Sequence, residues 1–102
     1  MAKKEYFLII DTETTDTDRV ADFAAVICDR KGNIYSQCAV LVDGIFTDKE
    51  NHPLFTDNSS SELWGQRSLN RRYGVYNDMV KNGSRMLASV PAINSWLAKA
   101  LN

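Results

Sequence analysis

The feature that most constrains the fold is an unbroken apolar run near the start of the chain, Tyr6–Ile10, which stops abruptly at the carboxylate of Asp11. A continuous apolar run of this length is typical of a strand that is covered on both faces and is therefore central in a sheet. We expect this first strand over residues 5–11. The run is far too short to cross a bilayer, so the sequence predicts no contact with a membrane.

Two more strands and two helices are predicted from the rest of the chain. Residues 20–28 and 34–42 are apolar segments that flank the turn-forming sequence Asp29–Asn33, which is a hairpin signal. Apolar residues at helical spacing predict helices over residues 62–82 and 90–101. The stripe of the first helix consists of Leu69, Tyr73, Tyr76 and Val80, and that of the second of Val90, Ile93, Leu97, Leu101 and the neighbouring Trp96.

Local signals mark the ends of these helices. Gly83 is placed to stop the first helix, and Ser89 followed by Pro91 is typical of a helix start. Met86 and Leu87 are expected to pack beneath the turn between the two helices. The predicted order is therefore β-β-β-α-α in one small domain spanning residues 1–102.

This order defines an α/β chain in which an antiparallel three-stranded meander precedes two helices. Three strands would leave the first strand paired on one edge only. Either a partner covers that edge or the chain is a piece of something longer.

The net charge of −1 conceals an uneven distribution. Residues 1–62 carry 12 acids against 6 bases, a net of −6, whereas residues 63–102 carry one acid against 6 bases, a net of +5. Such a split is typical of an acidic, metal-binding half beside a basic, phosphate-facing half, although a solvated basic helix face gives the same pattern. Cys28 and Cys38 are expected to be reduced thiols in the cytoplasm, and with His52 they are too few for a zinc site.

The sequence Asp11-Thr12-Glu13 follows the first apolar run. Alternation along an extended backbone places residues i and i+2 on the same face, so both carboxylates point the same way. Neighbouring carboxylates repel one another unless a cation lies between them. Mg²⁺ or Mn²⁺ suits such oxygen ligands, and two such ions cleave phosphodiester bonds by activating water and stabilising the leaving oxygen.

The segment Leu8–Thr15, Leu-Ile-Ile-Asp-Thr-Glu-Thr-Thr, resembles almost letter for letter the first exonuclease motif of the DEDD superfamily. This superfamily has the ribonuclease H-like fold and includes the proofreading subunit of bacterial DNA polymerase III. Val20–Val26 resembles the second strand of the family, with Asp22 at the position of a structural acid. The resemblance is specific over residues 6–29 and only topological from about residue 43 onward.

The resemblance implies a metal-dependent 3′-to-5′ exonuclease that acts on the 3′ ends of single-stranded DNA or RNA. At the matching positions, Asp11 and Glu13 would bind the metal pair, as catalytic residues. Thr12, Thr14 and Thr15 would lie against the terminal nucleotide. Asp16 stands where the family usually has glycine, and we expect its side chain to face solvent.

Nucleic-acid contacts are also expected from the basic part of the chain. Trp64 is a candidate for stacking on an unpaired base, and Arg67, Arg71 and Arg72 for binding phosphates. Arg71 and Arg72 fall off the apolar stripe of their helix and should face solvent. The aromatic residues at helical spacing, Tyr73, Tyr76 and Trp96, are expected in the core.

The second and third motif acids of the family, and its histidine or tyrosine general base, have no matching positions after Glu62. His52 is expected in a surface loop. We therefore expect the amino-terminal part of an exonuclease, whose site would be completed by further sequence, a second polypeptide or a homodimer. Two of four ligands should bind magnesium only weakly. The alternative is a non-catalytic binding or regulatory module that docks its open sheet edge on a partner protein.

Overall fold

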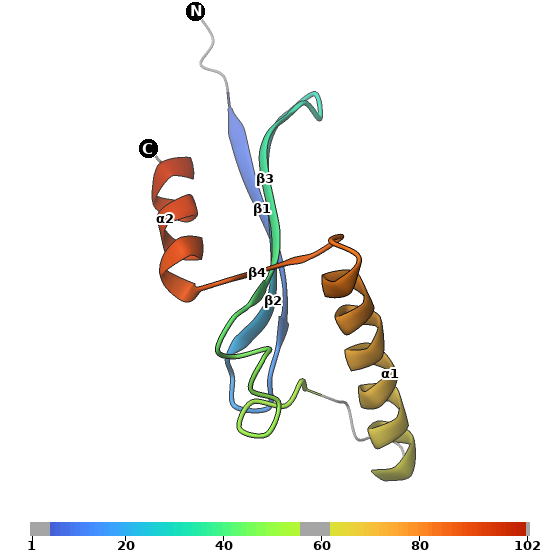
Figure 1. Ribbon diagram of the computed structural model, residues 1–102. Helices are drawn as coiled ribbons and strands as arrows, with labels where there is room; N and C mark the ends of the chain where they lie inside the picture. Colours follow the sequence, from blue (N-terminus) through green and yellow to red (C-terminus); the bar gives the residue numbers. More distant parts are fainter. Residues whose placement is uncertain (1–4, 56–61, 102) are drawn as a thin grey trace, which may run out of the picture.

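The computed structural model describes residues 5–55 and 62–101, without the side chains of residues 62–66. Three strands, a long helix, a short strand and a second helix follow one another along the chain (Figure 1). Their bounds are β1 Tyr6–Thr14, β2 Val20–Asp29, β3 Ile34–Val42, α1 Glu62–Lys81, β4 Met86–Ala88 and α2 Val90–Ala100. The protein is thus an α/β fold with a four-stranded mixed sheet in the order β1-β2-β3-β4.

The predicted antiparallel meander is confirmed, and its turn has a clear chemical basis. The carboxylate of Asp29 accepts hydrogen bonds from the backbone N–H groups of Lys31 and Asn33, from the Asn33 amide and from the Tyr35 hydroxyl. These bonds, with the Asn33 side chain the strongest, lower the pKa of Asp29 to about 2. Gly32 adopts a φ of 85°, a conformation that glycine tolerates without strain. The turn thereby sets the β2–β3 register.

Three expectations about the first strand are wrong. β1 runs to Thr14, so Asp11 lies inside the strand rather than at its end. Within the described residues it pairs with β2 alone, as a meander of three strands requires, and it is therefore an edge strand instead of the central strand that its apolar run indicates. Neither of its faces is well covered, because Phe7, Ile9 and Ile10 are 44%, 58% and 48% exposed. An apolar run indicates a preference for extended structure, whereas its burial depends on where the helices pack.

The short strand β4 was not predicted. It pairs parallel with β3 through Val40↔Met86, Leu41↔Leu87 and Val42↔Ala88. Met86 and Leu87 therefore extend the sheet instead of packing beneath a turn, and they remain 70% and 40% exposed. Three residues are too few to show a period of two, so periodicity cannot indicate a strand here.

α1 covers one face of the sheet, at the end where β1 and β2 are joined. The predicted stripe of α1 is confirmed, because its four residues pack on a buried cluster of Ala21, Leu41, Phe46 and Leu54. The rings of Tyr73 and Tyr76 lie 5.7 and 5.5 Å from that of Phe46. Gly83, with a φ of 82°, follows the helix as predicted.

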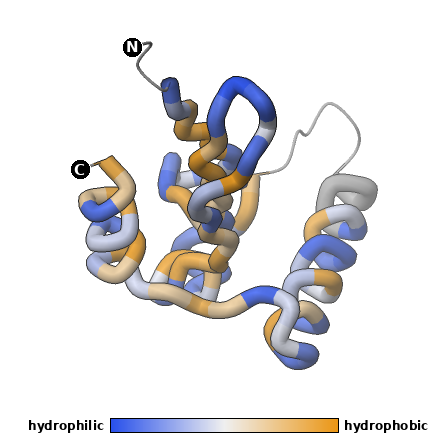
Figure 2. Tube along the Cα trace, turned by 90° about the horizontal axis from the view of Figure 1, so that it is seen from above, coloured by the Kyte–Doolittle hydropathy of each residue, from blue (hydrophilic) through white to orange (hydrophobic). Residues whose placement is uncertain are grey.

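α2 packs on the opposite face of the sheet, as the two views of the chain show (Figures 1 and 2). Ser89 is its N-cap, since the side-chain hydroxyl accepts a hydrogen bond from the Ala92 N–H. Ile93 is buried, and Trp96 and Leu97 pack against the same cluster. The ends of the predicted stripe are solvated instead, with Val90 44% and Leu101 70% exposed.

Candidate active site

Asp11 and Glu13 lie on the same face of β1, as the alternation of the strand requires. Their register partners on β2 are Ala24 and Asp22. Both acids are exposed, because β1 is at the edge of the sheet. The pairing shifts register between Glu13 and Thr14, so a bulge ends the regular ladder directly after the second acid. Two accessible carboxylates thus stand side by side at the rim of the sheet.

Their face is the one that α1 covers, and an α1 side chain reaches them. The guanidinium of Arg72 donates from Nη2 to Oε2 of Glu13 over 3.2 Å, and from Nη1 to the backbone oxygen of Phe55 over 2.9 Å. The side chains of Arg72 and Glu13 are 31% and 55% exposed. Arg72 therefore turns back to the sheet instead of facing solvent, which corrects its predicted orientation. Arg71 is exposed, as predicted.

The carboxylate next to Glu13 on the sheet, Asp22, is occupied by structural bonds. Its Oδ1 accepts a hydrogen bond from Arg85 over 2.5 Å and its Oδ2 accepts one from the Tyr76 hydroxyl over 2.7 Å. Arg85 also donates to the Val40 oxygen over 2.9 Å. Burial, and then the hydrogen bond to Asp22, raises the pKa of Tyr76 to about 12. The bonds of Asp22 therefore connect α1 and the segment before β4 to the sheet.

Arg85 was not singled out from the sequence. It is the only base between Lys81 and Lys99, and it directly precedes the apolar pair Met86-Leu87. A lone cation at the start of an apolar segment is a weak signal for a buried ion pair, and recognition of its partner requires the tertiary structure. The pair is mostly buried, with side-chain exposures of 16% for Arg85 and 15% for Asp22.

The donor set at Asp11 and Glu13 fits a magnesium or manganese ion in an open site. Both ions prefer oxygen ligands, and Mg²⁺ commonly binds through one or two carboxylates while water and substrate phosphate fill its other positions. Glu13 already attracts a cationic group, the guanidinium of Arg72. Within residues 5–55 and 62–101, no three or more His, Cys, Asp or Glu side chains gather as metal ligands. The chain therefore offers two carboxylates and leaves most positions to other ligands.

The three threonines of the motif have different environments. Thr12 and Thr14 are exposed, whereas Thr15 is 1% exposed. The Thr15 hydroxyl accepts a hydrogen bond from the Arg19 N–H and lies 2.8 Å from the Thr17 hydroxyl, which in turn lies 2.6 Å from Nδ1 of His52. Thr15 thus ties the β1–β2 turn together, and Thr12 and Thr14 are the two accessible to a ligand.

Four other residues were singled out from the sequence, and the structure describes the side chains of three of them. Asp16 is exposed, as expected. His52 lies in a loop, as expected, where its half-exposed ring contacts the Thr17 hydroxyl. Arg67 is exposed on α1, and the side chain of Trp64 lies outside the described part of the molecule.

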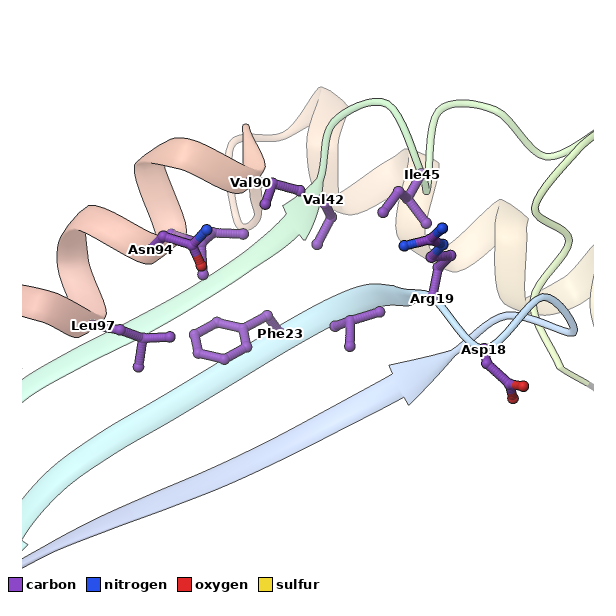
Figure 3. Close-up of a pocket in the computed structure, with 10 residues that line it drawn as sticks. Asp18, Arg19, Phe23, Val42, Ile45, Val90, Asn94 and Leu97 are labelled. Carbon is purple, nitrogen blue, oxygen red and sulfur yellow. The ribbon is translucent and has the colours of Figure 1, made fainter.

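A separate cavity of about 370 Å³ lies between α2 and the sheet (Figure 3). Its walls are apolar, with Phe23 and Leu97 facing one another and the charged groups of Asp18 and Arg19 at one end. Phe23 and Asp22 are consecutive on β2, so their side chains point to opposite faces of the sheet. The cavity is therefore on the other side of the sheet from Asp11 and Glu13.

Comparisons of the chain with models of protein families, with curated proteins and with solved structures gave no match. Neither described helix is long and apolar enough to cross a membrane. Cys28 and Cys38 are free, half-buried thiols. Cys28 faces Ile34 and Cys38 faces Ala25 in the register of the sheet, so the two cysteines are not neighbours.

Proposed function

We propose that this chain carries the first part of the active site of a metal-dependent 3′-to-5′ exonuclease with a ribonuclease H-like fold. The observation that supports this best is the pair Asp11 and Glu13, exposed on one face of an edge strand within a motif that resembles that of the DEDD superfamily. The proposed substrates are the 3′ ends of single-stranded DNA or RNA, and the proposed location is the cytoplasm.

In this proposal, Asp11 and Glu13 hold divalent cations at the end of the nucleic-acid strand. Bound Mg²⁺ or Mn²⁺ would supply Lewis-acid activation of water and charge neutralisation at the leaving oxygen. Thr12 and Thr14 are exposed, but strand alternation turns the side chain of Thr12 to the face opposite the two acids. Thr14, which follows the register shift, is therefore the hydroxyl that would orient the terminal nucleotide. Asp22 supports the site indirectly, because its bonds to Arg85 and Tyr76 keep α1 against the sheet.

The ladder of β1 and β2 also accounts for the spacing of the two acids. Residues two apart on a strand are separated by about 6.8 Å along its axis, a distance that side-chain rotation reduces to the reach of a shared ion or ion pair. The remaining ligands and the general base would come from further sequence, a second polypeptide or a second copy of the chain. Weak binding of magnesium by the chain alone follows from its two protein ligands.

The test is a nuclease assay combined with a binding measurement. The purified chain is incubated with 5′-labelled single-stranded DNA and RNA in Mg²⁺ or Mn²⁺, and Mn²⁺ binding is followed by calorimetry. The variant Asp11→Ala/Glu13→Ala is compared with Glu50→Ala/Asp78→Ala, which removes two exposed acids elsewhere. We expect Mn²⁺ binding, and any release of mononucleotides, to disappear in the first variant and persist in the second. Equal Mn²⁺ binding by both variants would exclude the proposed site.

The exposed edge of β1 favours a second candidate function, docking on a partner protein by strand addition. β1 is nine residues long, pairs on one side only within the described residues, and exposes Phe7, Ile9 and Ile10. Long apolar edges of this kind are templates for pairing with another strand. A chain that binds no Mn²⁺, releases no nucleotides and forms a stable complex through β1 would be such a module.

A further inference from the structure

A second cavity, of about 400 Å³, lies between α1 and the sheet and adjoins Glu13. Three arginines line it, Arg71, Arg72 and Arg85, together with Asp22, Tyr76, Val75 and Met79. These residues carry three positive charges against one negative charge, although most of the exposed cavity wall is apolar and the cations reach it mainly through Arg71 and Arg72. Guanidinium groups match the oxygens of a phosphate in both charge and geometry, which makes phosphate the ligand class that suits this cavity.

The three arginines differ in how firmly they are held. Arg85 is fixed by Asp22 and the Val40 oxygen, and its buried Nε has no hydrogen-bond partner among the described residues. Arg71 is exposed and forms no ion pair with the described residues. Arg72 is bound to Glu13 by a 3.2 Å contact between partly exposed groups, and its other guanidinium nitrogen donates to the Phe55 oxygen over 2.9 Å. Within the described part of the chain, one arginine is thus fixed, one forms no ion pair, and one is held by a carboxylate of the candidate metal site and by a backbone oxygen.

We propose that Arg72 exchanges between two anions, the Glu13 carboxylate and a backbone phosphate of the nucleic acid in the cavity. Without metal, Arg72 neutralises Glu13 from the α1 side. With a divalent cation at Asp11 and Glu13, Arg72 loses its counter-ion and joins Arg71 as a phosphate ligand. This inference rests on the proposed function, because it assigns the metal to those two acids.

The exchange is energetically inexpensive for the protein. An ion pair with exposures of 31% and 55% contributes little to stability, since solvent screens it. A cation with two charges competes well for the carboxylate, and the guanidinium can instead form two parallel hydrogen bonds to two oxygens of a tetrahedral phosphate. Because the same side chain opposes metal binding and favours phosphate binding, each ligand strengthens the binding of the other. Such coupling is reciprocal by thermodynamic necessity.

The experiment measures binding rather than catalysis. Calorimetry gives the affinity of the chain for Mn²⁺, and for thymidine 5′-monophosphate with and without Mg²⁺. The variants are Arg72→Gln, Arg71→Gln, Arg72→Lys and the control Lys81→Gln, which removes an exposed charge from the same helix outside the cavity. Circular dichroism and urea unfolding verify that each variant is folded.

We expect Arg72→Gln to bind Mn²⁺ about two- to fivefold more tightly, because the competing cation is gone. Its affinity for the nucleotide should rise less on addition of Mg²⁺ than that of the unchanged chain, because Arg72 is no longer released to bind the phosphate. Arg71→Gln should weaken nucleotide binding about three- to tenfold and leave Mn²⁺ affinity unchanged. Arg72→Lys keeps the charge and should retain the original Mn²⁺ affinity, and Lys81→Gln should change neither affinity.

Two failures are distinguishable. If Asp11→Ala/Glu13→Ala binds Mn²⁺ as well as the unchanged chain, the proposed function itself fails. If that variant loses Mn²⁺ binding but Arg72→Gln binds the ion no more tightly than Lys81→Gln, only the exchange is overturned. If both variants bind Mn²⁺ more tightly by the same factor, the exchange is also overturned, because the loss of any positive charge on α1 would then explain the change in affinity.

Discussion

β1 and β2 are neighbouring strands of similar length, and each contains a run of apolar residues, yet they differ sharply in burial. β2 buries Ala21, Phe23 and Ala25 on alternate positions, whereas β1 has only Leu8 partly covered among its nine residues. The helices lie over the β2 and β3 side of the sheet and leave much of the edge strand to solvent. Apolar content therefore predicts the strand, and the position in the sheet decides its exposure.

The same contrast appears in one pair of opposed residues, Glu13 on β1 and Asp22 on β2. Asp22 is 15% exposed and bound by Arg85 and Tyr76, whereas Glu13 is 55% exposed and, among the described residues, bound by Arg72 alone. The carboxylate of Asp22 therefore has a structural role, because two strong donors already occupy its oxygens. The carboxylate on the edge remains available to a ligand, which is why we assign the candidate metal site to β1 rather than β2.

The largest expected effect is a difference in stability between two phenylalanine variants, one on β1 and one on β2. Phe23→Ala on β2 removes a 6% exposed ring from the core and should lower the free energy of unfolding by about 3–4 kcal/mol. Phe7→Ala on β1 removes a ring that is 44% exposed and should cost about 1 kcal/mol or less. Urea denaturation, followed by tryptophan fluorescence, measures both. Equal losses would mean that the β1 face is covered in solution, and analytical ultracentrifugation would then show a larger assembly.

A smaller difference in stability is expected between variants of the two opposed acids, Asp22 and Glu13. Asp22→Asn leaves the Arg85 charge mostly buried without a counter-ion and should cost about 2–3 kcal/mol. Glu13→Gln should change stability by about 0.5 kcal/mol or less, because the pair with Arg72 is solvent-screened. The midpoints of urea unfolding at pH 7 give the comparison. A loss for Glu13→Gln as large as that for Asp22→Asn would make Glu13 structural and weaken its assignment as a metal ligand.

The smallest expected effect on stability comes from the Tyr76 hydroxyl, and it tests the structural role of Asp22. Because the folded-state pKa of Tyr76 is raised from 10.0 to about 12, its contribution is fully present below pH 10 and is lost as the pH rises toward 12. Tyr76→Phe should cost about 1 kcal/mol below pH 10 and remove this part of the alkaline decline. Urea midpoints between pH 8 and 12 test it. Tyr35, whose pKa is also raised, titrates in both proteins and cancels in the difference.

Much of the fold was predictable because its signals are local. The β2–β3 hairpin follows from the Asp29–Asn33 turn, and α2 follows from Ser89 and the residues after it. β4 was missed because three residues carry no measurable periodicity, and parallel pairing with β3 depends on where α1 returns the chain. The stripe of α1 was correct, but Arg72 was assigned to solvent because spacing alone does not show how far a long side chain reaches.

The candidate site likewise has one feature that the sequence predicts and several that only the tertiary structure shows. That Asp11 and Glu13 share one face follows from the two-residue period of a strand, and the sequence is sufficient for it. The arginine at Glu13, the bonds of Asp22 and the cavity with Arg71 and Arg85 bring together residues up to 63 positions apart. No local pattern encodes such distances.

The sequence by itself determined the order of the first three strands, the two helices and the common face of the two acids. These features depend on neighbouring residues, through backbone preference and side-chain alternation. Only the tertiary structure decided that β1 lies at the edge, that Asp22 is committed to the fold, and that Arg72 faces Glu13. Each of these depends on which elements pack together, because burial and charge pairing are set by neighbours in space rather than along the chain.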